Sequence, residues 1–274
     1  IEMGVNMLLD DGLLKVVCER LSVPHETLPG DTKESRIKGL VQRAAEIKRL
    51  FDLMKGIHAL YVERQMPVPD QLKEIVLAGK LELEVPLKTP AHFDCEYVYT
   101  IRGDGEVRVE TRILPQVDIP FLPRIGLQMR LPQGFEQLAW YGRGLHENYV
   151  DRNVGAPVGV YRGTVDEQFV PYLVPEENGN KTEIRWVTLT DAAGVGLHAS
   201  ASRLLEMSAH HFTPEDLTAA KHPHEIARRP EVVLHLDYGQ SGLGSASCGP
   251  GRLPKYYVRP EETRYCVYLR PFGP

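Results

Sequence analysis

The residues with the greatest capacity for chemistry lie in one glycine-punctuated stretch, Gly142 to Arg152. Its functional groups are an imidazole, carboxylates, an amide, a phenol and guanidinium groups, and the candidate site residues are His146, Glu147, Asn148, Tyr149, Asp151 and Arg152. Two interpretations stay open: a sugar-facing or interface loop, or a structural turn in which the carboxylates pair with arginines. A Glu/Asp pair is also what a glycosidase uses, but a loop fixes no separation between the two carboxylates.

Two further groups of residues suggest chemistry less strongly. The pairs His210-His211 and His222-Pro-His224 match no standard zinc spacing, and adjacent histidines on a strand point to opposite faces. Cys248 lies among small residues that allow close approach of a ligand, but it has no neighbouring charged activator. The sequence also contains no P-loop, GxGxxG or GxSxG element, so we expect neither a metal nor a cofactor.

The elements that position these residues fall into two parts with different periods. Residues 1–62 carry apolar side chains at spacings of three and four, which predicts a helical segment. Residues 63–80, which include two prolines one residue apart, are predicted to be a linker. Residues 81–274 show alternation with a period of two and frequent Gly and Pro, which predicts an antiparallel sandwich.

Several elements of the β part are predicted individually. The Asp104-Gly105 step between alternating runs predicts a hairpin over 99–107. A brief helix is expected over 214–220, with Thr213 as its cap. Other strands are expected at 81–85, 125–131, 184–189, 196–200, 232–238 and 265–270.

Length and charge exclude several classes of protein. The chain has 274 residues, 42% hydrophobic and 25% charged, with a net charge of -5, which is typical of a globular protein. Because basic residues are not in excess, neither nucleic acid nor an anionic membrane is expected as a partner. The four cysteines form no CxxC pair, and the chain opens with acidic residues where a signal peptide has basic ones, so a cytoplasmic location is expected.

Six short strings together resemble one known domain. They are LPRIGL from residue 122, WYGRG from 140, ENYVDR from 147, Tyr172, PEENG from 175 and SCGP from 247. Their order and spacing over residues 82–273 resemble the C-terminal, small-chain domain of β-galactosidases of glycoside hydrolase family two. The resemblance implies a galactose-mutarotase-like supersandwich, here without its first strands.

The same resemblance implies a function without catalysis by this chain. In that family both catalytic glutamates lie on a separate (β/α) barrel, so the chain is expected to have no catalytic residue of its own and to be inactive alone. It would pack on the barrel chain and contribute to the aglycone side of a β-galactoside (lactose) hydrolase site. Ser247 and Cys248 occupy the loop that contacts the aglycone sugar in the family, although Cys248 stands where the best-known members have tryptophan.

The N-terminal part offers an alternative. Residues 5–58, with the string LPGDTK from residue 28, resemble bacterial effector-associated death-like domains, which recruit partners by like-with-like association. An ordinary helical extension is the other interpretation. A carbohydrate-binding or sensor protein coupled through residues 1–60 to a signalling partner is therefore the alternative function, and an autonomous aldose mutarotase is a more distant one.

Overall fold

The fold is mainly β. A computed structural model describes residues 74–85, 91–244 and 249–274, so the predicted helical segment over 1–62 lies outside the described residues. Of the two compact units in the chain, the larger comprises residues 79–97 and 108–274. Within the described part of the chain, no helix is long and apolar enough to cross a membrane.

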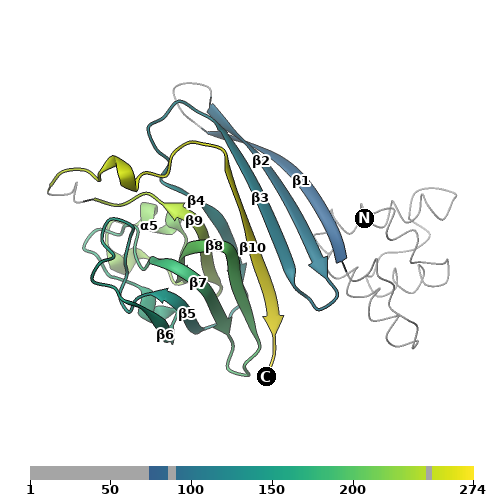
Figure 1. The fold of residues 1–274 in the computed structure, drawn as a ribbon. Coiled ribbons are helices and arrows are strands. Elements are labelled where there is room, and N and C mark those ends of the chain that lie inside the picture. Colours follow the sequence, from purple (N-terminus) through teal and green to yellow (C-terminus); the bar gives the residue numbers. More distant parts are fainter. Residues whose placement is uncertain (1–73, 86–90, 245–248) are drawn as a thin grey trace, which may run out of the picture. The chain divides into compact units, whose positions relative to one another are not determined.

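Ten strands join in one hydrogen-bonded sheet (Figure 1). The main path runs β1-β2-β3-β10-β8-β7-β5-β6, and β9 branches from β8 to pair with β4. Strand β8 pairs antiparallel with β7, β9 and β10. Strand β5 pairs antiparallel with β6 and β7, and β4 with β9, which confirms the predicted antiparallel class. The strands are β1 (Glu74–Val85), β2 (Ala91–Arg102), β3 (Val107–Gln116), β4 (Arg124–Leu131), β5 (Gln137–Arg143), β6 (Val158–Thr164), β7 (Lys181–Thr190), β8 (Gly196–His210), β9 (Val232–Gln240) and β10 (Thr263–Phe272).

The longest strand, β8, explains how the sheet branches. Its first half pairs with β10 and its second half with β9. Its register against β7 shifts on both sides of Ile184, beside Glu183, which has a positive φ of 54°. All six residues from Leu205 to His210 are buried, so the strand is enclosed on both faces. Because period-two alternation ends there, the sequence predicted only the 196–200 part of this strand.

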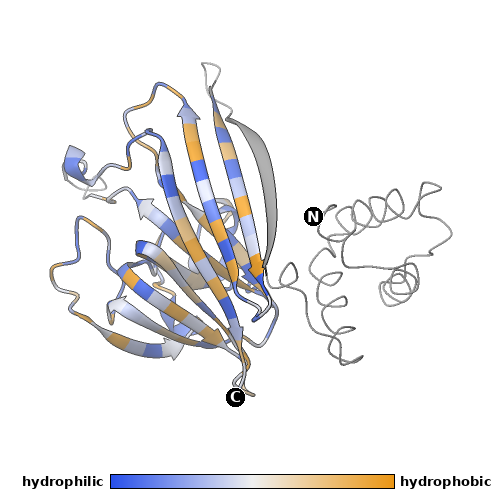
Figure 2. Cartoon of the chain, turned by 45° about the vertical axis from the view of Figure 1, so that its right-hand side comes forward, coloured by the Kyte–Doolittle hydropathy of each residue, from blue (hydrophilic) through white to orange (hydrophobic). Residues whose placement is uncertain are grey.

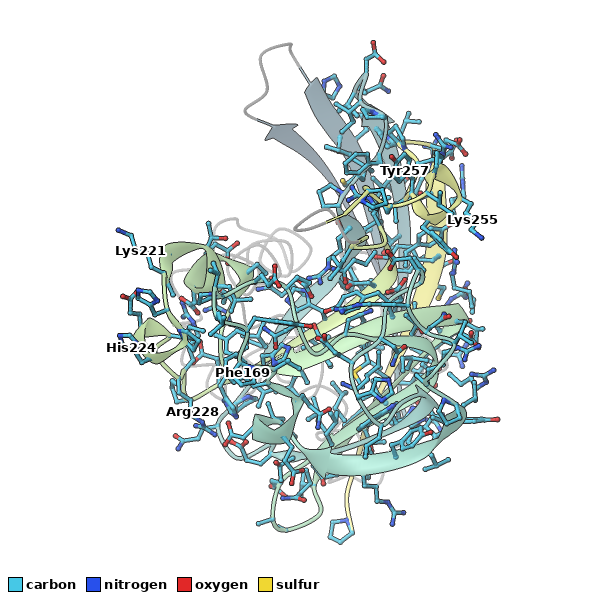
Figure 3. The ribbon with its side chains drawn as sticks, turned by 90° about the vertical axis from the view of Figure 1, so that its left-hand side faces the viewer. Phe169, Lys221, His224, Arg228, Lys255 and Tyr257 are labelled. Carbon is cyan, nitrogen blue, oxygen red and sulfur yellow. The ribbon has the colours of Figure 1, made fainter. Side chains whose placement is uncertain are left out.

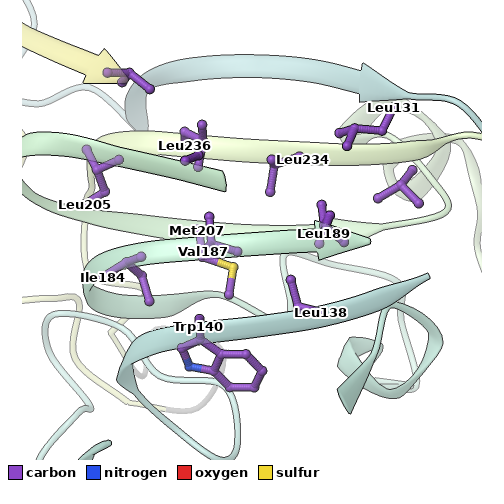
Figure 4. Packing of buried hydrophobic residues seen from close by; sticks show 14 of the residues in the cluster. Leu131, Leu138, Trp140, Ile184, Val187, Leu189, Leu205, Met207, Leu234 and Leu236 are labelled. Atoms are coloured by element: carbon purple, nitrogen blue, oxygen red, sulfur yellow. The ribbon is translucent and has the colours of Figure 1, made fainter. Parts of the chain in front are cut away.

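The core lies between the branches of this sheet. Leucines of β9, Met207 of β8, Val187 of β7 and Trp140 of β5 pack together in one cluster (Figure 4). Trp140 is 1% exposed and its indole nitrogen donates to the Arg143 carbonyl at 3.0 Å, so it packs in the core. Away from this cluster the strands alternate between apolar and polar residues (Figure 2), as the period of two predicted.

Local sequence signals give some elements accurately. The predicted hairpin forms, with Gly105 at a φ of 87° and its amide donating to the Arg102 carbonyl at 3.0 Å. The helix α5 (Pro214–Ala219) begins at a capping box in which Thr213 and Asp216 bond reciprocally. Both signals depend only on neighbouring residues.

Other elements differ from the predictions. The strands β5 and β6 were not predicted, because the glycine-punctuated string from Gly142 indicated a loop in this part of the chain. The strand β1 begins at Glu74, inside the 63–80 range predicted to be a linker. Among the described residues, three short 3-10 helices also connect strands: η3 (Asp166–Gln168), η4 (Pro223–Glu225) and η5 (Pro254–Tyr256).

Candidate functional site

Glu147 ties the loop between β5 and β6 to the segment that precedes β7. One carboxylate oxygen accepts hydrogen bonds from Arg152 Nη2 at 2.9 Å and from the Tyr172 hydroxyl. The other accepts from the Gly179 amide at 2.8 Å and from the Tyr149 hydroxyl at 3.3 Å. With only 10% of its side chain exposed, Glu147 joins two loops that are distant in sequence.

Asn148 is fully buried and bonds in three directions. Its Nδ2 donates to the carbonyl of the exposed His146 at 3.1 Å. Its Oδ1 accepts from the Thr182 amide at 2.9 Å and from the Thr182 hydroxyl at 2.6 Å. Its backbone exchanges bonds with Asn180, because the Asn148 amide donates to the Asn180 carbonyl and Asn180 Nδ2 donates to the Asn148 carbonyl. Asn148 therefore fixes the start of β7 against the loop.

Arg152 covers this arrangement from outside. Its guanidinium carbon lies 4.5 Å from the centre of the Tyr149 ring, while 46% of its side chain remains exposed. Burial raises the pKa of the Tyr149 phenol well above its ordinary value, so this hydroxyl stays protonated and donates to Glu147. The polar side chains of Glu147, Asn148 and Tyr149 are therefore bonded to other groups of this chain.

Replacing Arg152 with alanine is expected to lower the free energy of unfolding by about 1–2 kcal/mol, because Glu147 loses its charged partner while it stays mostly buried. Urea unfolding would measure this, with Arg162→Ala on the exposed side of β6 as the control. Sugar affinity should change little. An unchanged unfolding free energy together with lost sugar binding would contradict this structural role.

Asp151 connects the same loop to the β9–β10 connection. Its Oδ2 accepts a hydrogen bond from the Gly244 amide at 2.6 Å. Gly242 also approaches so closely that a Cβ there would lie 2.6 Å from the Asp151 carboxyl carbon, so only glycine fits. Ser247 and Cys248 themselves lie outside the described residues. The structure nevertheless brings Asp151 to the start of the short segment that contains them.

Arg124 is the centre of a buried polar network that the spacing of residues along the chain does not predict. Its Nη2 donates to Glu177 at 2.6 Å and to Gln240 at 3.0 Å, and its Nη1 lies 2.9 Å from His235 Nδ1. Its Nε lies 3.0 Å from Asp237 Oδ2. The only sequence signal was that Arg124 and Glu177 belong to two of the strings that carried the family resemblance, and here these strings meet.

Glu206 and Asp237 are opposite one another in the β8–β9 pair. Burial raises the pKa of Glu206 to about 7 and that of Asp237 well above its ordinary value. Glu206 accepts hydrogen bonds from Asn180 Nδ2 at 2.8 Å and from the Gln240 amide at 3.2 Å. Because both carboxyls are buried within strands, at 6% and 1% exposure, they are closed to a substrate.

The histidines separate into two environments. His210 and His211 are both buried, although they are adjacent on the chain, because β8 ends there and is covered on both sides. His222 and His224 are exposed and stack on each other with ring centres 5.5 Å apart.

A buried cation also lies in the core: Lys181 donates to the Gly179 carbonyl at 2.8 Å, and burial lowers its pKa to about 8.

Comparison with known proteins identifies relatives of this chain. The family described as "Beta galactosidase small chain" matches residues 44–269. This match begins well before residue 82, the first residue covered by the resemblance of the short strings. A β-galactosidase of Priestia megaterium is 34% identical over 66% of this chain and 17% of its own length. A β-galactosidase of Vibrio cholerae is 37% identical over 78% of this chain and 21% of its own length.

The chain therefore spans about a fifth or less of the curated relatives it matches. Among solved structures, a GalM/aldose epimerase homologue from C. elegans overlaps 75% of this chain and 67% of its own chain, with 9% identity and a TM-score of 0.39. A likeness at that level is too weak to identify a function.

Proposed function

The chain belongs to the β-galactosidase small-chain family, and from this premise we propose that it is a non-catalytic domain that packs on a (β/α) barrel chain. In this role it contributes to the aglycone side of a site that hydrolyses β-galactosides such as lactose. The observation that carries the proposal is the family match over residues 44–269. The described residues form one antiparallel sheet rather than a barrel, which fits a chain that depends on a catalytic partner.

A surface suited to such a partner lies on the two loops that Glu147 joins. Leu145 and Val154, in the loop after β5, are 65% and 96% exposed. Leu173 and Val174 follow Tyr172, which bonds to Glu147, and they are 89% and 67% exposed. We call these four side chains the loop face. Exposed apolar side chains held on anchored loops favour a protein interface.

The aglycone contact is proposed for the segment with Ser247 and Cys248. Support comes from Asp151, which holds Gly244 at the start of this segment beside the loop that contains Leu145. Docking through the loop face would therefore bring the segment toward the partner chain as well. A serine hydroxyl and a small thiol leave more room for the aglycone than the large flat ring of tryptophan does.

Hydrolysis of o-nitrophenyl-β-galactoside by the purified chain, alone and mixed with a β-galactosidase catalytic chain that lacks its small-chain region, tests the proposal. We expect activity in the mixture and none from either chain alone. Activity of this chain alone would overturn the non-catalytic role. No activity in the mixture, although the two chains form a complex, would contradict the contribution to the site.

The loop face gives a sharper prediction. Leu173→Asp combined with Val174→Asp should weaken association with the catalytic chain by about tenfold or more, because charged groups would be buried in an apolar contact. Both side chains are exposed, so the melting temperature should stay the same. Val160→Asp on β6, where the valine is 58% exposed, is the matched control. Equal affinity of the double variant and the control would exclude the loop face as the interface.

A further inference from the structure

A pocket of about 300 Å³ lies where η3, the end of β8 and the η4 segment come together. Its polar lining includes Asp166, His210, His211 and Arg228, and its apolar lining includes Phe169. Figure 3 shows Phe169 and Arg228 on the face turned to the viewer. The volume is at the lower end of the range for small-molecule sites.

The arrangement of charges in this pocket does not fit a metal ion. Glu136, Asp166 and His211 do offer three ligand atoms within 4.8 Å of one another. Arg228 Nη2, however, lies 2.9 Å from His211 Nε2, 3.2 Å from Asp166 Oδ2 and 3.5 Å from Glu136 Oε2. The guanidinium therefore supplies the positive charge that a metal would supply, and it occupies the position between the ligand atoms.

His210 provides a buried acceptor that has no partner. The residue is 6% exposed, and its Nε2 lies 2.9 Å from the Asn178 carbonyl, so Nε2 carries the hydrogen. Burial lowers the pKa of this imidazole to about 4, which keeps it neutral at neutral pH. Its Nδ1 is then a lone-pair acceptor, and no described residue donates to it. This nitrogen has almost no accessible surface, so the neutral imidazole forms part of the pocket wall and adds no charge to it.

The apolar side of the pocket is a fixed aromatic wall. Phe212 stacks on His210 with ring centres 4.5 Å apart, and Phe169 meets Phe212 edge to face at 5.3 Å. Phe169 is the partly exposed member of this group. A flat apolar face of a ligand can therefore lie against Phe169, while polar groups of the ligand reach the Asp166–Arg228 pair.

We propose that this pocket binds a neutral monosaccharide in its pyranose form, with hydroxyls bonding to Asp166 and Arg228 and a C–H face against Phe169. The carboxylates of Glu136 and Asp166 would repel an anionic ligand. Arg228 pairs with both carboxylates, so a cationic ligand is not needed to balance their charge. None of the residues that line this pocket belongs to the loop face, so the inference goes beyond the proposed function.

Titration of the full chain with D-galactose and D-glucose, followed by saturation-transfer NMR and calorimetry, tests the site. We expect affinity of about millimolar, as for a small polar ligand. Phe169→Ala should weaken it at least about tenfold, whereas Phe272→Ala on β10, at 37% exposure, should leave it unchanged.

A second variant keeps the test independent of folding. Asp166→Asn changes an exposed carboxylate to an amide of the same size, and it should weaken sugar binding several-fold with the melting temperature nearly constant. The proposal is overturned if neither sugar binds the wild-type chain. It is equally overturned if binding persists unchanged in both Phe169→Ala and Asp166→Asn, which would place the sugar elsewhere.

Discussion

Replacing Arg124 with alanine is expected to lower the free energy of unfolding by about 3–5 kcal/mol, the largest effect of any single substitution considered for this chain. The guanidinium bonds to Glu177 and Gln240 and lies 3.0 Å from the buried carboxyl of Asp237. Without Arg124, that carboxyl must stay charged and unpaired, or it must take up a proton. Urea unfolding at neutral pH would measure the loss.

The pH dependence of this variant separates the two possibilities. If Asp237 takes up a proton in the folded variant, the folded state binds one more proton than the unfolded state above pH 3.8, the ordinary pKa of an aspartate. The stability of Arg124→Ala should then fall as the pH rises. Burial already raises the pKa of Asp237 in the wild type and Arg124 lowers it, so the deficit of the variant should grow at pH values above the pKa that Asp237 has in the wild type. The double variant Arg124→Ala with Asp237→Asn should recover part of the loss.

The same strand supplies the control for Arg124. Arg130 pairs with Glu231 at 3.6 Å, but 55% of its side chain is exposed. Arg130→Ala should therefore change the free energy of unfolding by less than about 1 kcal/mol. Equal losses for the two alanine variants would mean that the buried network contributes no more than a surface ion pair does.

Replacing Asn148 with alanine is expected to cost about 2–4 kcal/mol. The substitution leaves the buried Thr182 amide and hydroxyl without their acceptor and the His146 carbonyl without its donor. Each buried group left without a partner costs about 1–3 kcal/mol. Thermal and urea unfolding would both report the loss.

Two variants in the same loop make this result specific. Asn153→Ala is the matched control. Arg143 and Ala156 each donate a hydrogen bond to the backbone carbonyl of Asn153, and alanine keeps this carbonyl. Asn148→Asp keeps an acceptor for Thr182, but it replaces the amide donor with a carboxyl that must be buried, so it should also lower stability. A loss as small for Asn148→Ala as for Asn153→Ala would show that Asn148 does not hold the loop on β7.

The candidate site shows where sequence reasoning stops. The string from Glu147 to Arg152 indicated ion pairing within the loop, and Glu147 does pair with Arg152. The sequence did not indicate that Tyr172 and Gly179 bond to the same carboxylate, or that Asp151 bonds to Gly244. These partners lie tens of residues away, and only the pairing of strands determines which loops meet.

Features that depend on neighbours along the chain and on shared motifs could be predicted from the amino-acid sequence. The period of two predicted antiparallel strands, Gly105 predicted the hairpin turn because a positive φ favours glycine, and Thr213 predicted the start of α5. The order of the short strings identified the small-chain family, which the match over residues 44–269 confirms.

Which polar groups are buried together depends on how distant strands pack. Leu205 to His210 lost the alternating pattern because β8 is covered on both faces. That burial encloses Glu206 beside Asp237 and Arg124, and it leaves His210 Nδ1 without a partner at the pocket of Phe169 and Arg228. Burial depends on the packing of strands far apart in sequence, so the spacing of residues along the chain does not predict these two features.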